Sequence, residues 1–168
     1  MHPFDVEEAL QSMVVLVDTR EQQTAALQQR CKAFGQWERM KLEAGDYSAK
    51  FKLPDGGWYF LPASVERKFG IDELCMCYCR ERKRFEREFL RAQNAGIKLY
   101  LLVEDATWKK VYGGKYHSQM RPQSLTASIF AWLARYNCQI IFCEKELSGQ
   151  MIRDILYREG KESLLKHE

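Results

Sequence analysis

Short apolar runs separated by amphipathic stretches predict that strands and helices alternate along this chain. Runs rich in valine, leucine and isoleucine are too short for helices and predict buried strands. These strands are expected at residues 13–17, 97–103 and 138–143. Helical spacing, closed by glycine at several ends, predicts the segments between them. The helices are expected at about residues 24–33 and 72–94, from Pro122 onward, and as one or two segments within 148–165.

The segment after Pro122 shows the clearest helical pattern. Proline is favoured at the first position of a helix, where its missing N–H costs nothing. Apolar residues then recur at a spacing that places them on one face. This face comprises Leu125, Ile129, Trp132, Leu133 and Tyr136. One side of this helix is therefore expected to pack on the core.

A β-hairpin is predicted between the first two helices. Its strands are expected at residues 37–53 and 58–68, joined by the strong turn signal Pro54-Asp55-Gly56-Gly57. Asp46 and Glu66 are equally far from Gly56, so a symmetric hairpin places their Cβ atoms about 5 Å apart. A one-residue shift at either proline of the hairpin would change this pairing.

Strand alternation brings further polar groups to the same place. Glu66 and Lys68 share one face of their strand, while Arg67 points to the other. Asp18 lies at the end of the first strand and can join the group. Strands that alternate with helices, plus one hairpin, predict the α/β class, with a mixed central sheet flanked by helices.

Length and composition favour one intracellular domain. With 168 residues, 46% of them hydrophobic, the chain fits a single domain, which we place at residues 13–168 after an N-terminal extension at 1–12. The apolar runs are far shorter than the roughly 20 residues of a membrane span, and the acidic start is no secretory signal. Six cysteines without a Cys-x-x-Cys pair argue against a disulfide scaffold or a zinc site. A cytoplasmic protein, nuclear in a eukaryote, is expected.

Charge is distributed unevenly along the chain. The net charge is only +3, but residues 106–143 contain no aspartate or glutamate and five basic residues. Such one-sided charge is typical of a surface that meets phosphate. Within this stretch, an acid-free loop is expected at residues 108–117, and it interleaves basic and aromatic side chains. This pattern favours DNA contact over a merely solvated loop. The predicted DNA-binding residues are Lys109, Lys110, Tyr112, Lys115, Tyr116 and Arg121, with Trp108 as a further stacking candidate. A second basic cluster at residues 80–91 is diluted by glutamates at helical spacing and ranks below the loop.

Carboxylates gathered beside a lysine suit phosphodiester chemistry. Oxygen ligands favour hard cations such as Mg²⁺ or Mn²⁺, which polarise phosphate and lower the pKa of a bound water. A lysine such as Lys68 can orient that water or stabilise charge that develops on phosphorus. The same residues also occur in plain surface ion pairs, so spacing alone leaves both interpretations open.

The motifs resemble one family in particular. Gly45-Asp46, then Glu66-Arg67-Lys68 with Asp72 four residues later, matches the GD…ERKxxxD signature. That signature resembles the nuclease domain of the XPF-type structure-specific endonucleases, in the restriction-endonuclease-like superfamily. The segments 17–21 and 84–92 are also similar to it, and the likeness covers about residues 13–144.

The resemblance implies a restriction-endonuclease-like fold and Mg²⁺- or Mn²⁺-dependent cleavage of branched, flapped or forked DNA in repair, recombination or replication. By this likeness Asp46 and Glu66 are metal ligands, Asp18 a further ligand and Lys68 the catalytic lysine. The supporting residues are Glu21, Arg67 and Asp72. Asp72 also suits the alternative role of a helix N-cap.

Two alternatives stay open. One is a junction resolvase or restriction-like nuclease of the same fold, and the other is a catalytically inactive DNA-binding scaffold. The complete set of Asp46, Glu66 and Lys68 argues against the scaffold. Relatives usually continue into a tandem helix-hairpin-helix module, for which this sequence leaves no room. A homodimer or a separate targeting protein is therefore compatible with the sequence, and no membrane partner is expected.

Overall fold

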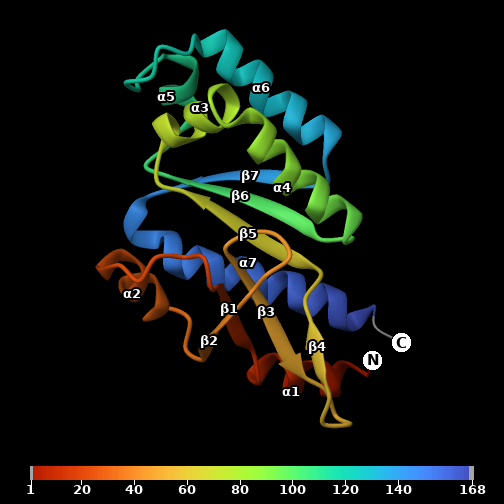
Figure 1. The fold of residues 1–168 in the computed structure, drawn as a ribbon. Helices are drawn as coiled ribbons and strands as arrows, with labels where there is room; N and C mark the ends of the chain where they lie inside the picture. The colour runs from red at the N-terminus through yellow and green to blue at the C-terminus, as the bar shows by residue number, and fades with distance from the viewer. Residues whose placement is uncertain (1, 167–168) are drawn as a thin grey trace. The chain divides into compact units, whose positions relative to one another are not determined.

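The computed structural model describes residues 2–166 and shows a mixed α/β fold (Figure 1). Residue 1 of the predicted extension and residues 167 and 168 of the predicted domain lie outside the described part. Seven strands form one sheet in the order β2-β1-β3-β5-β6-β7, with β4 paired to β3. The strands are β1 Val14–Asp18, β2 Trp37–Met40, β3 Tyr47–Lys52, β4 Trp58–Phe60, β5 Ala63–Lys68, β6 Lys98–Glu104 and β7 Cys138–Cys143. The predicted mixed central sheet is confirmed.

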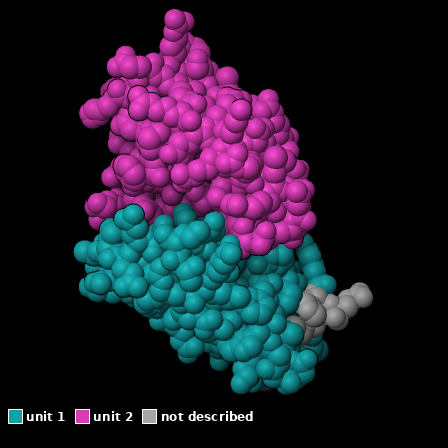
Figure 2. All heavy atoms as spheres, in the orientation of Figure 1, with its two compact units in different colours: residues 1–42, 46–64, 149–168 teal, residues 43–45, 65–148 magenta. Residues whose placement is uncertain are grey.

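Helices account for most of the remaining described residues. They are α1 Pro3–Gln11, α2 Ala25–Cys31, α3 Ile71–Cys79, α4 Arg82–Asn94, α5 Trp108–Tyr112, α6 Pro122–Arg135 and α7 Ser148–Leu165, with a 3₁₀ turn η1 at Lys145–Leu147. Among the described residues, no helix combines the length and the apolar character that a bilayer span requires. The chain groups into two compact units, residues 1–42, 46–64 and 149–168, and residues 43–45 and 65–148 (Figure 2).

The first unit is built on β1, which pairs in parallel with β2 and antiparallel with β3. Val15 pairs with Ala49, and both are fully buried on one face of the sheet, with Phe51 further along the same face. Helix α7 packs there: a Cβ on Gly160 would lie 2.2 Å from Cζ of Phe51. Only glycine allows this approach of helix and ring.

The predicted hairpin strand 37–53 is wrong, because it is two strands. The first part, β2, is parallel to β1, and β3 begins only at Tyr47. Gly45 ends the loop between them with φ 78°, a left-handed conformation that side chains disfavour. This backbone conformation explains why the residue before Asp46 is a glycine.

The turn lies where the sequence predicts it, but its centre is displaced. Leu53 N–H donates to Gly57 O, and Gly56, with φ 85°, donates to Leu53 O. Lys50 pairs with Phe60, so the β3–β4 hairpin is centred on Asp55. The expected symmetry about Gly56 is therefore wrong, and β4 ends before Leu61 and Pro62. Turn symmetry does not determine the position of Glu66 relative to Asp46.

The second unit contains β6 and β7, paired in parallel, and a core formed with α3, α4 and α6. On α6, Leu125, Ile129 and Trp132 are completely or almost completely buried, which confirms the predicted apolar face. The predicted helix 72–94 is instead two helices. Residues 80–84 read Arg-Glu-Arg-Lys-Arg and offer no apolar side chain to the core, so the chain changes direction there.

Candidate active site

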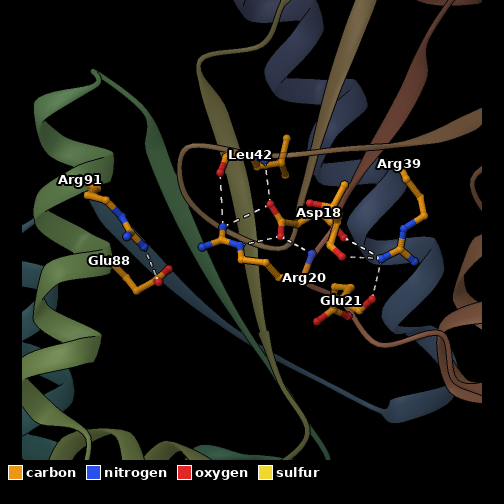
Figure 3. A network of polar contacts seen from close by, with 8 residues as sticks. Asp18, Arg20, Glu21, Arg39, Leu42, Glu88 and Arg91 are labelled. Carbon is orange, nitrogen blue, oxygen red and sulfur yellow. Dashed lines mark hydrogen bonds and ion pairs between the residues drawn. The ribbon is translucent and has the colours of Figure 1, made fainter.

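Asp18 sits at the carboxyl end of β1 in the first unit, with only 1% of its surface exposed. Its Oδ1 accepts from the backbone N–H and the Nε of Arg20, both at 2.7 Å. Its Oδ2 accepts from the backbone N–H of Leu42 at 2.7 Å and from Nη2 of Arg20 at 3.2 Å. Figure 3 shows the carboxylate enclosed by these donors.

These contacts determine the charge state of Asp18. Burial would raise the pKa of its carboxyl, but the hydrogen bonds from Arg20 and Leu42 outweigh burial and lower the pKa. Asp18 is therefore an anion that ties the loop after β2 to the end of β1. A cation at this carboxylate would have to displace the Arg20 guanidinium.

Asp46 lies next to the hydrogen-bond network of Asp18. Its carbonyl accepts the backbone N–H of Asp18 at 2.8 Å, so the two aspartates adjoin through the main chain. The Asp46 side chain is half-buried. The structure therefore places Asp18 and Asp46 together in the first unit, at the ends of neighbouring antiparallel strands.

Glu21 supports the same end of the first unit. Its Oε2 accepts the hydroxyl of Tyr47 at 3.1 Å and lies 3.8 Å from Nη2 of Arg30. The Arg30 Nε donates to the same hydroxyl at 3.0 Å. Arg39 Nη2 donates to backbone carbonyls of the segment after β1, including Glu21 O at 2.7 Å (Figure 3).

Sequence reasoning missed three arginines, Arg20, Arg30 and Arg39. Arg20 follows directly after Asp18-Thr19, and this adjacency was a usable signal. Arg30 is buried and Arg39 reaches back from β2. Nothing in a helix or strand pattern marks an arginine as buried, because burial depends on the tertiary partner.

Glu66 and Lys68 lie on one face of β5 in the second unit, as the strand alternation predicts. The Lys68 Nζ donates to Oε1 of Glu66 at 2.6 Å, and both side chains are buried. Burial alone would lower the pKa of Lys68, but the charge of Glu66 outweighs it and raises the pKa. Burial raises the pKa of Glu66, against the opposing charge of Lys68. Lys68 is therefore a fixed ammonium at neutral pH.

Glu73 joins this pair from the first turn of α3. Its Oε1 lies 3.9 Å from the Lys68 Nζ, and its Oε2 accepts the backbone N–H of Phe69 at 2.7 Å. The sequence predicts Glu73 only as an opening residue of the helix, with no role in the site. An acidic residue in the first turn of a helix, five positions after the lysine, was the available signal.

Arg67 points away from Lys68 and pairs with Glu104. Its Nη1 lies 3.0 Å from Oε2 of Glu104, a fully buried residue at the end of β6. Glu104 was also missed, although it is the acidic end of a predicted buried strand. The pair links β5 to the end of β6 within the second unit.

Asp72 is not a helix N-cap, and that alternative is wrong. The cap of α3 is Gly70, and Asp72 lies within the first turn. Its Oδ1 accepts the backbone N–H groups of His117 and Ser118 at 2.8 and 2.7 Å. Asp72 thus anchors the end of the acid-free loop to α3.

The predicted DNA-binding residues divide into exposed and engaged side chains. Lys109, Lys115 and Arg121 are exposed, and Tyr112 is 61% exposed. Other side chains have internal partners: Lys110 Nζ donates to Asp105 O at 2.7 Å, and the Tyr116 hydroxyl donates to Met120 O at 2.8 Å. Trp108 stacks on Phe130 with ring centroids 5.5 Å apart. The predicted loop is wrong over its first half, because residues 108–112 form helix α5 after the N-cap Thr107. Tyr112, at the end of α5, is the most exposed Trp or Tyr ring of residues 108–116.

The second basic cluster is paired in part, as its glutamates predict. Arg84 lies 3.5 Å from Glu81, at i,i+3 spacing. Arg91 pairs with Glu88 at the same spacing (Figure 3). Arg82 lies over the ring of Trp132, 5.0 Å from its centroid. These pairs reduce the charge that the cluster could offer a phosphate.

The donor chemistry fits a hard cation. Carboxylate oxygens are the only candidate ligands that the motifs supply, and Mg²⁺ and Mn²⁺ prefer them. Among residues 2–166, no three His, Cys, Asp or Glu side chains are already grouped as a metal site. Arg20 and Lys68 supply the positive charge that balances Asp18 and Glu66.

Comparisons with known proteins identify the family and the fold of this chain. The ERCC4 domain matches residues 17–155. A solved structure of XPF from Aeropyrum pernix is similar, with a TM-score of 0.59, 19% identity and 92% of this chain covered. A second, of XPF from Aeropyrum pernix in complex with DNA, gives a TM-score of 0.61 and 19% identity over 89% of this chain. No curated protein matches the chain.

The chain spans 62% and 66% of the lengths of those two structures, slightly less than two thirds. The ERCC4 match includes Asp18, Asp46, Glu66, Lys68 and Asp72. This chain belongs to the ERCC4 domain family.

Proposed function

We propose that this protein is a Mg²⁺- or Mn²⁺-dependent DNA endonuclease that cuts branched, flapped or forked DNA. The observation that supports it most is the buried Glu66–Lys68 ion pair on β5, inside an ERCC4 domain that also has Asp18 and Asp46. A buried charged pair costs desolvation energy, so stability alone is a poor reason for it. Buried charged groups are common at reaction sites, so a catalytic role explains this pair better than stability does.

In this proposal Asp46 and Glu66 hold the cation, with Asp18 as a further ligand once Arg20 moves aside. The bound ion would polarise a phosphate oxygen and lower the pKa of a coordinated water. Lys68, kept protonated by Glu66, cannot accept a proton at neutral pH. It donates hydrogen bonds to the attacking water or to the phosphate oxygens, where negative charge develops. Glu73 holds the Phe69 backbone beside it.

Supporting residues keep these groups in place. Glu21, Arg30 and Tyr47 fix the segment after β1. Arg67, which lies between Glu66 and Lys68 on β5, pairs with Glu104 at the end of β6. DNA is proposed as the substrate because of the exposed lysines of the acid-free loop and the likeness to a protein whose structure is of a DNA complex. A homodimer or a separate targeting protein is compatible with this function, as is a part in repair or recombination.

The test is cleavage of matched DNA substrates by wild type, Asp46→Ala and Lys68→Ala. Flap, fork, four-way junction and linear duplex DNA are incubated with Mg²⁺ or Mn²⁺. We expect the wild type to cut branched substrates in preference to linear duplex, and both variants to lose cleavage. Cleavage that survives both substitutions would disprove the site. Preference for the four-way junction would indicate a resolvase, and metal-independent binding without cutting would indicate a scaffold.

The loop lysines give a second prediction. Replacing Lys109 and Lys115 with Ala should weaken binding to duplex DNA and reduce the slope of log K against log salt by about 2, roughly one unit for each phosphate contact. Replacing Lys110 should change it less, because its Nζ is bonded to Asp105 O. Fluorescence anisotropy at several salt concentrations measures the slopes. Identical slopes in wild type and the double variant would show that the loop does not contact phosphate.

A further inference from the structure

The second unit has a pocket that the proposed reaction does not use. It lies between the outer face of α3 and residues 117–120, and its volume is about 700 Å³. Sites for small organic groups usually measure a few hundred to a thousand cubic ångströms. The pocket is therefore large enough for a planar ring system.

Its walls are rich in sulfur. Cys75, Met76 and Cys79 come from α3, and Met120 faces them from the loop. Met76 is 40% exposed, although methionine is usually buried. Thioethers are polarisable and make favourable contacts with aromatic rings of different shapes. This lining suits the flat face of an aromatic group better than a charged or strongly hydrated one.

The rim of the pocket is polar and includes one arginine, Arg80, and one aspartate, Asp72. Arg80 lines the pocket at the end of α3, and Gln119 offers an amide that can both donate and accept. The His117 side chain is 93% exposed, with Nδ1 3.6 Å from Oδ2 of Asp72. A guanidinium at the rim can meet a phosphate while the amide meets polar ring edges.

The shape of the pocket depends on Asp72. Its two hydrogen bonds to the backbone of His117 and Ser118 hold the loop wall against α3. Both N–H groups donate to Oδ1 of Asp72, which directs this carboxylate oxygen toward the loop wall. The loop wall belongs to the acid-free stretch 106–143, and α3 begins only three residues after Lys68. One wall of the pocket thus comes from the acid-free stretch, and the other comes from the helix that directly follows β5 along the chain.

We propose that this pocket receives an unpaired nucleobase from the single-stranded part of a branched DNA substrate. The inference rests on the proposed function and adds to it a device that distinguishes unpaired from paired DNA. A base offers an apolar face for the sulfur side chains, polar edges for Gln119 and a phosphate for Arg80. A paired base cannot enter, because it stays stacked within the duplex. An apolar side chain of a partner protein would fit the sulfur lining but would make no polar contact with Arg80 or Gln119.

The test compares two flapped duplexes that differ only in the single-stranded arm. One arm has thymines near the branch and the other has abasic sites at the same positions. Binding is measured by fluorescence anisotropy with EDTA present, so that cleavage does not interfere. The proteins are wild type, Met76→Glu, Met76→Lys and the control Leu147→Glu, an exposed apolar position outside the pocket.

The ratio of the two affinities identifies base capture. We expect wild type and Leu147→Glu to bind the thymine arm about 5-fold or more tightly than the abasic arm, as base stacking does elsewhere. Both Met76 variants should reduce the ratio to about 1, although their opposite charges shift overall affinity in opposite directions. Because Met76→Glu and Met76→Lys change the overall affinity in opposite directions, a loss of the ratio in both variants indicates that base capture is blocked.

Other outcomes contradict the inference in recognisable ways. Equal wild-type affinity for both arms would disprove base capture and leave the proposed nuclease function standing. An unchanged ratio in both Met76 variants would place any base contact elsewhere and point to a protein ligand for the pocket. Failure of the wild type to bind either duplex would contradict the proposed function, and with it this inference.

Discussion

Replacing Lys68 with Met should lower the rate of DNA cleavage by about 100- to 1000-fold, the usual effect of losing one donor that stabilises developing charge. The substitution keeps the apolar stem of the side chain and removes only the ammonium. Single-turnover kinetics with saturating Mg²⁺ measure the chemical step. Binding of the same DNA with EDTA present should change little, because Lys68 is buried and contributes little to the surface charge.

The same substitution should also destabilise the fold. Removing one partner of a buried ion pair leaves the other charge uncompensated, typically at a cost of about 3–5 kcal/mol. Without Lys68, burial raises the pKa of Glu66 further above its value in the unfolded chain. A group with a raised folded pKa loses its stabilising effect as the pH rises through that pKa. Urea unfolding should therefore show a deficit that widens from pH 5 to pH 8.

The matched control is the double variant Lys68→Met with Glu66→Gln. It removes both charges, so most of the lost stability should return while cleavage stays absent. The double variant should also lose the pH dependence between pH 5 and pH 8. If it is no more stable than Lys68→Met alone, the two groups do not form an energetically coupled pair. If cleavage by Lys68→Met equals that of the wild type, Lys68 has no catalytic role.

Replacing Asp18 with Ala should destabilise the protein by about 3 kcal/mol at neutral pH. Two backbone N–H groups, those of Arg20 and Leu42, lose their acceptor, and each such loss costs about 1–3 kcal/mol when the group is buried. The Arg20 guanidinium is half exposed, so loss of its charge pairing adds little. Chemical denaturation at pH 7 measures the change.

The pH dependence identifies the cause. The pKa of Asp18 is lowered in the folded state, so its stabilising effect is present above the unfolded pKa and is lost as the pH falls through the folded pKa. The difference in unfolding free energy between wild type and variant should therefore shrink below about pH 4. Asp18→Asn serves as the control, because its amide oxygen can still accept one backbone N–H. A difference that does not change with pH would show that charge is not what Asp18 contributes.

Much of the fold could be predicted from local pattern. The strands around Val15, Leu101 and Ile140, the α6 face and the turn at Gly56 all follow from side-chain periodicity and from residues with special backbone freedom. These features depend on neighbours in sequence, which is why they can be recognised without a structure. The break between α3 and α4 was missed because charged residues at 80–84 are compatible with a helix locally.

The candidate site could likewise be predicted only in part from the sequence. By itself, the sequence determined which residues are proposed to supply the chemistry: Asp18, Asp46, Glu66 and Lys68 are recognisable from motif order. The shared face of Glu66 and Lys68 follows from strand alternation. Only the tertiary structure decided what surrounds them. In the folded chain, Asp18 accepts hydrogen bonds from Arg20 and Leu42, and Glu73 lies beside Lys68. Asp72 accepts backbone N–H groups of a loop that is distant in sequence. The physical reason is that burial and charge pairing depend on which surfaces meet when the chain folds, and sequence spacing does not contain that information.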